Sequence, residues 1–263
     1  MGGICMGSYL NPGNLSFRGS LRSKIYIDKS ELIARTNEAL CTEQKYICVS
    51  RPRRFGKSMA ANMLAAYYDR SEDTAELFQN LAISKDRSYR ENLNQYDVIK
   101  INMQEFLSMS ETMEEMLEML KNYLILDFKE IFHEIQFRDE KNLIQVMKDV
   151  FRYTKCPFVI LIDEWDCLFR EYKQNKEAQK KYLDFLRAWL KDKDYVALAY
   201  MTGILPIKKY GSHSALNMFT EYSMTDPGDL AGYFGFTEQE VSRLCDTYGM
   251  NFEEAKTWYD GYH

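Results

Sequence analysis

The sequence predicts an α/β fold of three layers, with a mostly parallel β-sheet between two layers of helices. Two observations predict this fold. Short segments that are apolar throughout alternate along the chain with amphipathic helical patterns, as expected for strands that are covered on both faces. A Gly-Lys-Ser sequence also stands between the first of these strands and the helix that follows it. Beyond residue 225 the pattern becomes purely helical, so we expect a small helical region after the sheet.

Hydrophobic spacing places the individual elements. Uniformly apolar segments predict strands at 46–50, 97–102, 158–163 and 195–202, with a fifth at 219–224. Apolar residues at helical spacing predict helices over 29–40, 59–67, 113–135, 143–151 and 178–190. Thr237 and Glu240 have the spacing of a capping box, which predicts that a further helix begins there.

Three regions are expected along the chain. Residues 1–22 are rich in Gly, Ser and Asn and are predicted to be a loose entry segment, and residues 23–224 form the core. Residues 225–263 begin a helical lid or linker region. An aromatic stretch at 258–263 ends the chain without a helix cap or a polar tail, so we interpret this last region as an interrupted domain.

Composition excludes some classes of protein. A net charge of −5 gives no reason to expect a chain wrapped on nucleic acid, although a local basic patch stays open. No apolar stretch approaches the ~20 residues that cross a bilayer, and no basic segment followed by an apolar core marks a signal peptide. The 6 cysteines form no C-x-x-C pair. We therefore expect a reduced, cytoplasmic protein with neither a membrane span nor structural zinc.

A candidate phosphate-binding loop, of the kind called Walker A, lies between the first strand and its helix. Backbone N–H groups at a helix N-terminus attract phosphate oxygens, and Gly56 allows the backbone to approach closely. Lys57 is expected to reach the β- and γ-phosphates of ATP, and the Ser58 hydroxyl to join the Mg²⁺ shell. The general motif has Gly five residues before Gly56, where this chain has Arg51. The predicted nucleotide-binding residues are Arg53, Arg54, Phe55, Gly56, Lys57, Ser58 and Met59.

Two acidic residues end the third predicted strand, in the manner of a Walker B motif. Asp163 is expected to hold Mg²⁺, and Glu164 to orient and deprotonate the attacking water. They stand about 105 residues after the loop, and ligands of open parallel sheets bind at the carboxyl ends of strands. The loop or the acidic strand end alone would be weak evidence for a nucleotide site, but together they favour one.

Other polar residues leave two interpretations open. Thr202 ends the fourth strand and is predicted to hydrogen-bond the γ-phosphate or the attacking water, with a simple turn before Gly203 as the alternative. Asn102, at the end of the second strand, is a similar candidate, whereas Asp166 is expected to be structural. Arg51, together with the two arginines of the predicted loop, can clamp phosphate, act on a neighbouring protomer or pair with surface carboxylates.

Six short segments resemble the AAA-ATPase-like family of bacterial proteins, in the order of that family. They are 26–30 (YIDKS), 51–58 (RPRRFGKS), 161–166 (LIDEWD), 202–205 (TGIL), 233–237 (YFGFT) and 258–262 (WYDGY). In that family Arg at position 51 is usual. The resemblance runs from about Ser16 to the last residue. It implies a P-loop NTPase fold of the additional-strand class with the sheet order 5-1-4-3-2. It also implies that full-length relatives continue into a C-terminal PD-(D/E)xK nuclease-like domain.

Two functions are compatible with these residues. The first is an ATP-hydrolysing switch or motor that uses ATP and Mg²⁺ and acts on a C-terminal effector. The second is a nucleotide-binding regulatory or scaffold module that seldom hydrolyses ATP. Glu164 favours the first, while the lack of a clear arginine finger within the chain leaves room for the second. A homo-oligomer stays open for the same reason, and so does contact with nucleic acid.

Overall fold

The computed structural model describes residues 6–207 and 216–259 and places all five predicted strands in one parallel sheet. The strands lie in the order β2-β3-β4-β1-β5, which is the order 5-1-4-3-2 that the family resemblance implies. Their bounds are β1 Tyr46–Ser50, β2 Asp97–Asn102, β3 Phe158–Asp163, β4 Val196–Gly203 and β5 Thr220–Tyr222. Every residue of β1, β3 and β4 is buried, because helices cover both faces of the sheet. The predicted three-layer α/β fold is confirmed.

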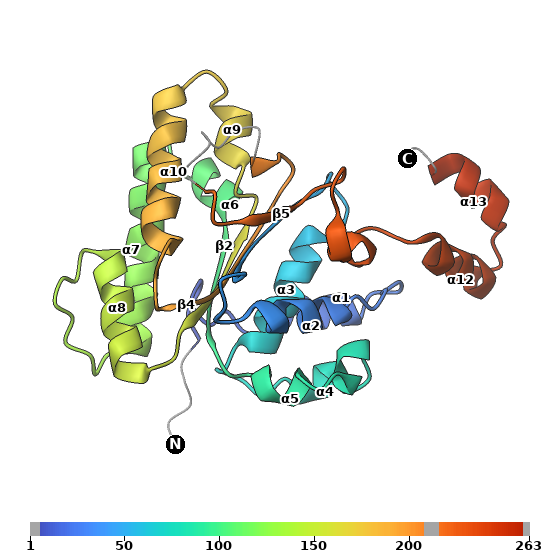
Figure 1. The fold of residues 1–263 in the computed structure, drawn as a ribbon, viewed down its shortest axis with the longest axis horizontal. Helices are drawn as coiled ribbons and strands as arrows, with labels where there is room; N and C mark the ends of the chain where they lie inside the picture. Colours follow the sequence, from blue (N-terminus) through green and yellow to red (C-terminus); the bar gives the residue numbers. More distant parts are fainter. Residues whose placement is uncertain (1–5, 208–215, 260–263) are drawn as a thin grey trace.

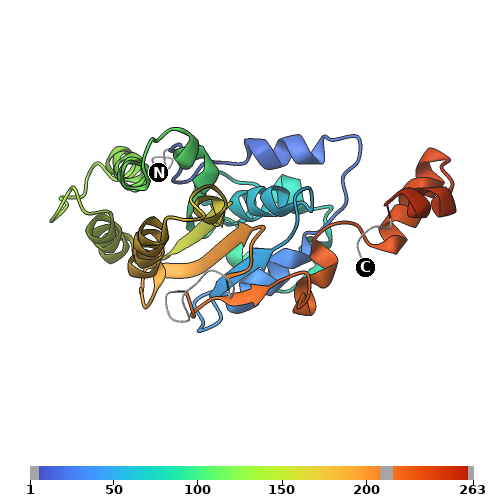
Figure 2. The same cartoon turned by 90° about the horizontal axis from the view of Figure 1, so that it is seen from above.

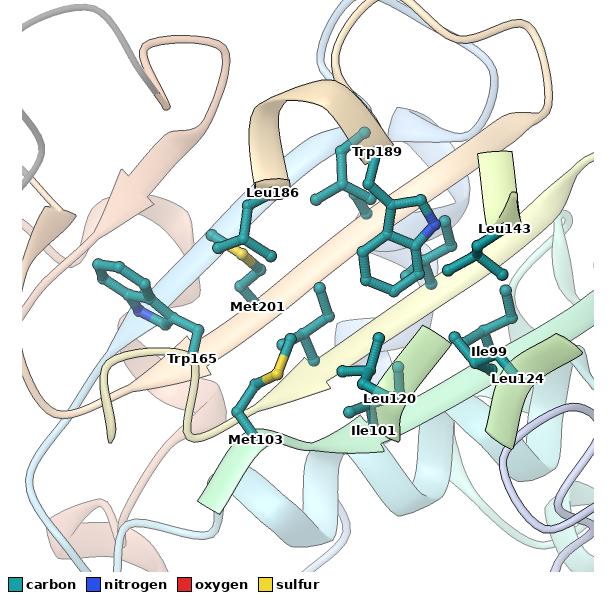
Figure 3. Close-up of a cluster of buried hydrophobic side chains, with 14 of the residues drawn as sticks. Ile99, Ile101, Met103, Leu120, Leu124, Leu143, Trp165, Leu186, Trp189 and Met201 are labelled. Carbon is teal, nitrogen blue, oxygen red and sulfur yellow. The ribbon is translucent and has the colours of Figure 1, made fainter. Parts of the chain in front are cut away.

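One layer of helices packs against the sheet through a large apolar core. It consists of α6 Met103–Ser108, α7 Met113–Ile131, α8 Leu143–Thr154, α9 Cys167–Glu171 and α10 Lys176–Leu190. Figure 3 shows Leu120 and Leu124 of α7 beside Ile101 and Ile99 of β2, with Trp189 of α10 nearby. The two long helical patterns at 113–135 and 143–151 therefore supply this layer, as their apolar spacing predicts.

The opposite layer contains α3 Lys57–Tyr68, which lies across the middle of the sheet (Figures 1 and 2). Shorter helices surround it: α1 Leu15–Leu21, α2 Glu31–Ala39, α4 Ala75–Phe78 and α5 Tyr89–Asn92, with the 3₁₀ helix η1 Ala82–Lys85. Successive strand residues point to opposite faces, so the side chains on the face with α3 differ from those on the face with α7. This layer contains Lys57 and Ser58, in the first turn of α3.

The N-terminal segment differs from the expectation of a loose entry. The Asp127 carboxylate accepts hydrogen bonds from the N–H groups of Tyr9 (2.7 Å) and Leu10 (3.0 Å), and Leu10 is fully buried. The ring of Phe17, in α1, stacks on the ring of Phe78, with 5.1 Å between their centroids. Gly and Ser content predicted looseness, but buried apolar side chains and a carboxylate from α7 fix residues 9–21.

The helical region after the sheet is present and extends to one side of the core (Figures 1 and 2). It consists of η2 Gly228–Tyr233, α12 Glu238–Tyr248 and α13 Phe252–Tyr259. The capping box of Thr237 and Glu240 is present, which confirms the predicted helix start. Lys29 Nζ lies 2.6 Å from the Glu240 carboxylate and ties α12 to the core. The end of the aromatic stretch, at 260–263, lies outside the described residues.

Candidate nucleotide-binding site

The loop between β1 and α3 ends at a glycine in an unusual backbone conformation. Gly56 is the N-cap of α3, in the left-handed conformation with φ of +79° and ψ of +11°. A Cβ atom there would meet nothing within 4 Å, so the backbone conformation and not crowding favours glycine. Arg54 also has a positive φ, of 70°. The first turn of α3 therefore begins at the loop, where its N–H groups lack helical partners.

Lys57 is enclosed by the loop that it follows. Its side-chain Nζ donates hydrogen bonds to the carbonyls of Arg51 (3.0 Å) and Pro52 (2.9 Å), and the residue is 5% exposed. Burial lowers the pKa of Lys57, while the negative charges of Glu164 and Asp163 act in the opposite direction. A buried ammonium group thus lies close to the carboxyl ends of the strands.

Asp163 is the point at which three elements of the site meet. Its Oδ2 accepts a hydrogen bond from Ser58 Oγ of α3, and its Oδ1 accepts one from Thr202 Oγ1 of β4. Asp163 is 5% exposed and Thr202 is fully buried. Ser58 and Thr202 are 105 and 39 residues away from Asp163 in the sequence, and both donate to its carboxylate.

These oxygens suit a hard cation that also contacts phosphate. Mg²⁺ is commonly bound by one or two carboxylates together with phosphate oxygens and water, and Ser58 and Asp163 supply a hydroxyl and a carboxylate side by side. Within residues 6–207 and 216–259, no group of three or more His, Cys, Asp or Glu side chains could hold a metal ion by itself. The residues fit a cation shared with a bound phosphate and not an all-protein metal cage.

Glu164 follows directly but has different surroundings. Its backbone is left-handed, with φ of +54°, and its N–H donates to Asp163 Oδ1 at 3.0 Å. Its carboxylate is paired with the guanidinium of Arg170, in α9. The chain thus turns sharply at Glu164 and directs its carboxylate toward α9. Arg170 was not predicted from the sequence, because a spacing of six residues after Glu164 does not by itself indicate contact.

An apolar cleft of about 170 Å³ adjoins the loop. The predicted loop residues Arg54, Phe55, Gly56 and Met59 line one part of it. Ala60 and Met63, in the helix that follows the loop, also line it. The remainder comes from segments whose proximity to the loop was not predicted from the sequence: Phe17, Ser20, Ile25, Tyr26, Ile27, Lys29, Tyr233, Gly235 and Phe236. The N–H of Gly235 donates to the carbonyl of Phe55 at 3.1 Å, so the chain after η2 is attached directly to the loop.

Comparison with known families agrees with this architecture. The family model described as "Predicted AAA-ATPase" matches residues 18–212. The chain belongs to the AAA-ATPase-like family. Membership implies the binding of a nucleotide, usually with Mg²⁺, and is compatible with oligomerisation.

One curated relative is similar to this AAA-ATPase-like chain. It is the "Uncharacterized protein in vnfD 5'region" of Azotobacter chroococcum mcd 1, which is 22% identical over 249 residues. The alignment covers 90% of the present chain and 45% of the relative. The AAA-ATPase-like chain therefore spans less than half of that protein's length.

Some polar residues of the AAA-ATPase-like chain that were considered for phosphate binding have other partners in the structure. Arg51 is buried and donates to the carbonyl of Tyr222 at 2.7 Å, with its guanidinium 5.6 Å from the centre of the Phe234 ring. It therefore joins the loop to β5 and to the chain after η2. Asn102 caps α6 by accepting from the N–H of Gln104 at 3.0 Å. Arg53 is exposed, and its predicted contact with the nucleotide stays a prediction.

Asp166 of the AAA-ATPase-like chain has a structural role, as the sequence predicts. It is fully buried, and its Oδ2 accepts from the N–H groups of Ile204 (3.0 Å) and Leu205 (2.7 Å). These bonds fix the turn after β4. Gly203 is required in that turn because an added Cβ would lie 2.7 Å from Trp165 Nε1.

Membrane insertion gains no support from the helices of the AAA-ATPase-like chain. Within the described residues, the structure contains no helix with the length and apolar character that a bilayer span requires.

Proposed function

We propose that this chain binds ATP with Mg²⁺, hydrolyses it, and acts as a switch or motor for an effector domain. The observation that carries the proposal is the convergence of Ser58 and Thr202 on the buried carboxylate of Asp163, beside the buried ammonium of Lys57. Hydroxyl, carboxylate and ammonium groups at the N-terminus of a helix are the set that phosphoryl-transfer sites of this class use. An effector such as a nuclease-like domain is proposed from the family resemblance.

The loop and α3 would bind the phosphates. Lys57 now donates to two carbonyls of its own loop, and a triphosphate offers it a stronger, charged acceptor. Ser58 and Asp163 would hold Mg²⁺, which stabilises charge that develops on the transferring phosphoryl group. Thr202 donates to Asp163 and so would position that carboxylate, while its predicted direct contact with the γ-phosphate or the attacking water stays a prediction.

The adenine base would lie in the apolar cleft. The cleft adjoins Gly56, where the phosphates would begin, and its walls include the aromatic side chains of Tyr26 and Phe236. Predominantly apolar clefts with a few polar groups are usual for small-molecule sites. Gly235, which bonds the loop, also belongs to the wall. Binding at the cleft would therefore reach the chain that leads into α12, and this gives the switch a physical route.

Glu164 would accept the proton of the attacking water. In this structure the guanidinium of Arg170 contacts the Glu164 carboxylate, so the oxygen that would take the proton already has a partner. This pair favours a second candidate function, a regulatory module that binds ATP and hydrolyses it seldom. The two functions differ in turnover and not in binding.

Binding and phosphate release by the same chain test the proposal. We expect calorimetry to show Mg²⁺-dependent ATP binding, and Lys57→Ala to weaken it at least tenfold, because a hydrogen bond to a charged group contributes about 1.5–3 kcal/mol. Lys45→Ala is the matched control: Lys45 Nζ also donates to a backbone carbonyl, that of Lys193 at 3.3 Å, but Lys45 precedes β1. Equal affinities for all three proteins would refute the proposal. Binding without phosphate release would favour the regulatory module.

A further inference from the structure

Arg170 lies between two carboxylates at the carboxyl ends of the strands. Its Nη2 contacts the Glu164 carboxylate and lies 3.4 Å from Oε1 of Gln104, and its Nε is 3.5 Å from Oδ2 of Asp166. The side chain is 16% exposed. Within the described residues the buried Nε makes no hydrogen bond, since its approach to Asp166 is an ion pair without hydrogen-bond geometry. The guanidinium is thus enclosed, with part of its donor capacity unused.

The positive charge of Arg170 also affects the side chain of Lys57. Burial is the largest cause of the lowered pKa of Lys57, and the positive charge of Arg170 lowers it further. Two cations therefore act near one another, and the carboxylates of Asp163, Glu164 and Asp166 offset them. A triphosphate bound over Lys57 would bring several negative charges into this region. Arginine binds phosphate through two parallel N–H donors, so it is well suited to contact such a group.

We propose that Arg170 contacts the terminal phosphate of bound ATP, and that it leaves Glu164 to do so. This inference rests on the proposed ATP site. The exchange is local, because Arg170 is in the short helix α9 and its partner Glu164 is in the turn before it. One guanidinium would then have two partners in succession: the base while the site holds no triphosphate, and the phosphate when it does.

The exchange would release the base for hydrolysis. The water oxygen forms the new bond to the γ-phosphorus, and the bond from that phosphorus to the β–γ bridging oxygen breaks. Glu164 takes the proton of the water, and ADP leaves with the electron pair of the broken bond. Arg170 would offset the charge on the γ-phosphoryl group during this step. The positive group would then come from within the chain, although the sequence shows no clear arginine finger there.

The proposal requires Arg170 to distinguish ATP from ADP, because ADP has no terminal phosphate of this kind. The decisive comparison is Glu164→Gln against the double variant Glu164→Gln/Arg170→Ala. In the Glu164→Gln background the ion pair is already gone, so any remaining effect of Arg170 on nucleotide affinity arises elsewhere. We expect the double variant to bind a non-hydrolysable ATP analogue about tenfold or more weakly than Glu164→Gln, with ADP affinity unchanged.

Two further variants control for folding. Arg170→Gln in the same background gives a shorter side chain that keeps N–H donors near the position of Nε, beside Asp166, but loses the outer donors of the guanidinium. It should lose the same preference for the ATP analogue. Arg138→Ala removes an arginine whose Nε lies 3.6 Å from the buried Asp149, in a different part of the molecule, and should leave both affinities unchanged. Thermal melting of each variant shows whether it is folded.

The outcomes separate this inference from the proposed function. If both Arg170 variants bind the ATP analogue and ADP as tightly as Glu164→Gln does, Arg170 is a structural partner of Glu164 and the inference is wrong, while the proposed function stands. An equal loss of affinity for both nucleotides also contradicts it, since that result reports a general distortion of the site. If the unsubstituted chain binds neither nucleotide, the proposed function and this inference fail together.

Discussion

The phosphate end and the base end of the candidate site are built in different ways. The phosphate end consists of Lys57, Ser58, Asp163 and Thr202, which stand at the ends of strands or the start of α3. The base end is the apolar cleft, whose walls come from α1, the segment before α2, α3 and the chain after η2. The positions of the residues at the phosphate end are set by the register of the strands that carry them. The shape of the base end depends instead on how separate segments of the chain pack together. The phosphate end should therefore carry affinity and chemistry, and the base end should couple binding to the helical region.

The largest expected effect belongs to the base at the phosphate end. Glu164→Gln keeps the size of the side chain but removes its basicity, so ATP turnover should fall by about 10²-fold or more while ATP binding persists. Phosphate release under saturating ATP measures this. Glu171→Gln, at the end of α9 and without a proposed role, is the control. Turnover of Glu164→Gln at the rate of the unsubstituted chain would show that Glu164 is structural.

A smaller effect is expected for the hydroxyl that positions the metal-binding carboxylate. Thr202→Val preserves shape and removes the donor to Asp163, so Mg²⁺ affinity in the presence of ATP should fall about tenfold, as for other residues that orient metal ligands. Thr202→Ser should restore it. Thr154→Val, which removes a hydroxyl that donates to a carbonyl within α8, is the control. Titration of ATP binding with Mg²⁺ reports the change, and an unaltered Mg²⁺ dependence would separate Thr202 from the metal.

At the base end we expect an effect of a different kind. Phe236 is 61% exposed and lines the cleft, so Phe236→Ala should weaken ATP and ADP equally, by about threefold to tenfold, because both share the adenine base. Binding of inorganic tripolyphosphate should not change. Tyr153→Ala, on α8 and 62% exposed, removes a comparable aromatic side chain from another surface. Equal losses for tripolyphosphate and ATP would place Phe236 outside a base pocket.

The smallest expected effect on stability and ATP affinity belongs to Gly235, whose N–H bonds the loop at the phosphate end while the residue lines the base end. Gly235 has φ of +73°, and an added Cβ would lie 3.1 Å from the Phe55 ring, so Gly235→Ala should destabilise the fold by about 1 kcal/mol and also weaken ATP binding. Gly249→Ala is a matched control, since Gly249 has φ of +64° and its added Cβ would meet nothing within 4 Å. Both variants should lose similar stability in chemical denaturation. A loss of ATP affinity in both would remove the special role of the Phe55 contact.

Sequence predicted the phosphate end better than the base end for a physical reason. Asp163 and Thr202 follow uniformly apolar strands, and parallel strands present their carboxyl ends at one edge, so their proximity follows from the fold class. The cleft has no such rule, because Tyr26 and Phe236 meet the loop only through tertiary packing. Arg170 was missed for a related reason: an arginine six residues beyond Glu164 becomes its partner only because α9 turns back over the strand ends.

Two expectations from local composition did not match the packing. Arg51 was considered for phosphate because it adjoins the loop, but its side chain is buried against Tyr222 and Phe234. The entry segment looked loose because it is rich in Gly and Ser, but Leu10 and Phe17 are buried apolar anchors within it. In both places a buried side chain decided the structure, and burial is not visible in local composition.

Hydrogen exchange with and without Mg·ATP tests the central claim most directly, namely that both ends form one nucleotide site. The account predicts slower exchange in 53–60, at the loop and the start of α3, and in 233–236, at the cleft wall. Both effects should need at least tenfold more Mg·ATP in Lys57→Ala than in the unsubstituted chain, and should keep the original dependence on Mg·ATP in Lys45→Ala. Slower exchange confined to the loop would contradict the joining of the two ends, and no change in either segment under saturating Mg·ATP would contradict the site itself.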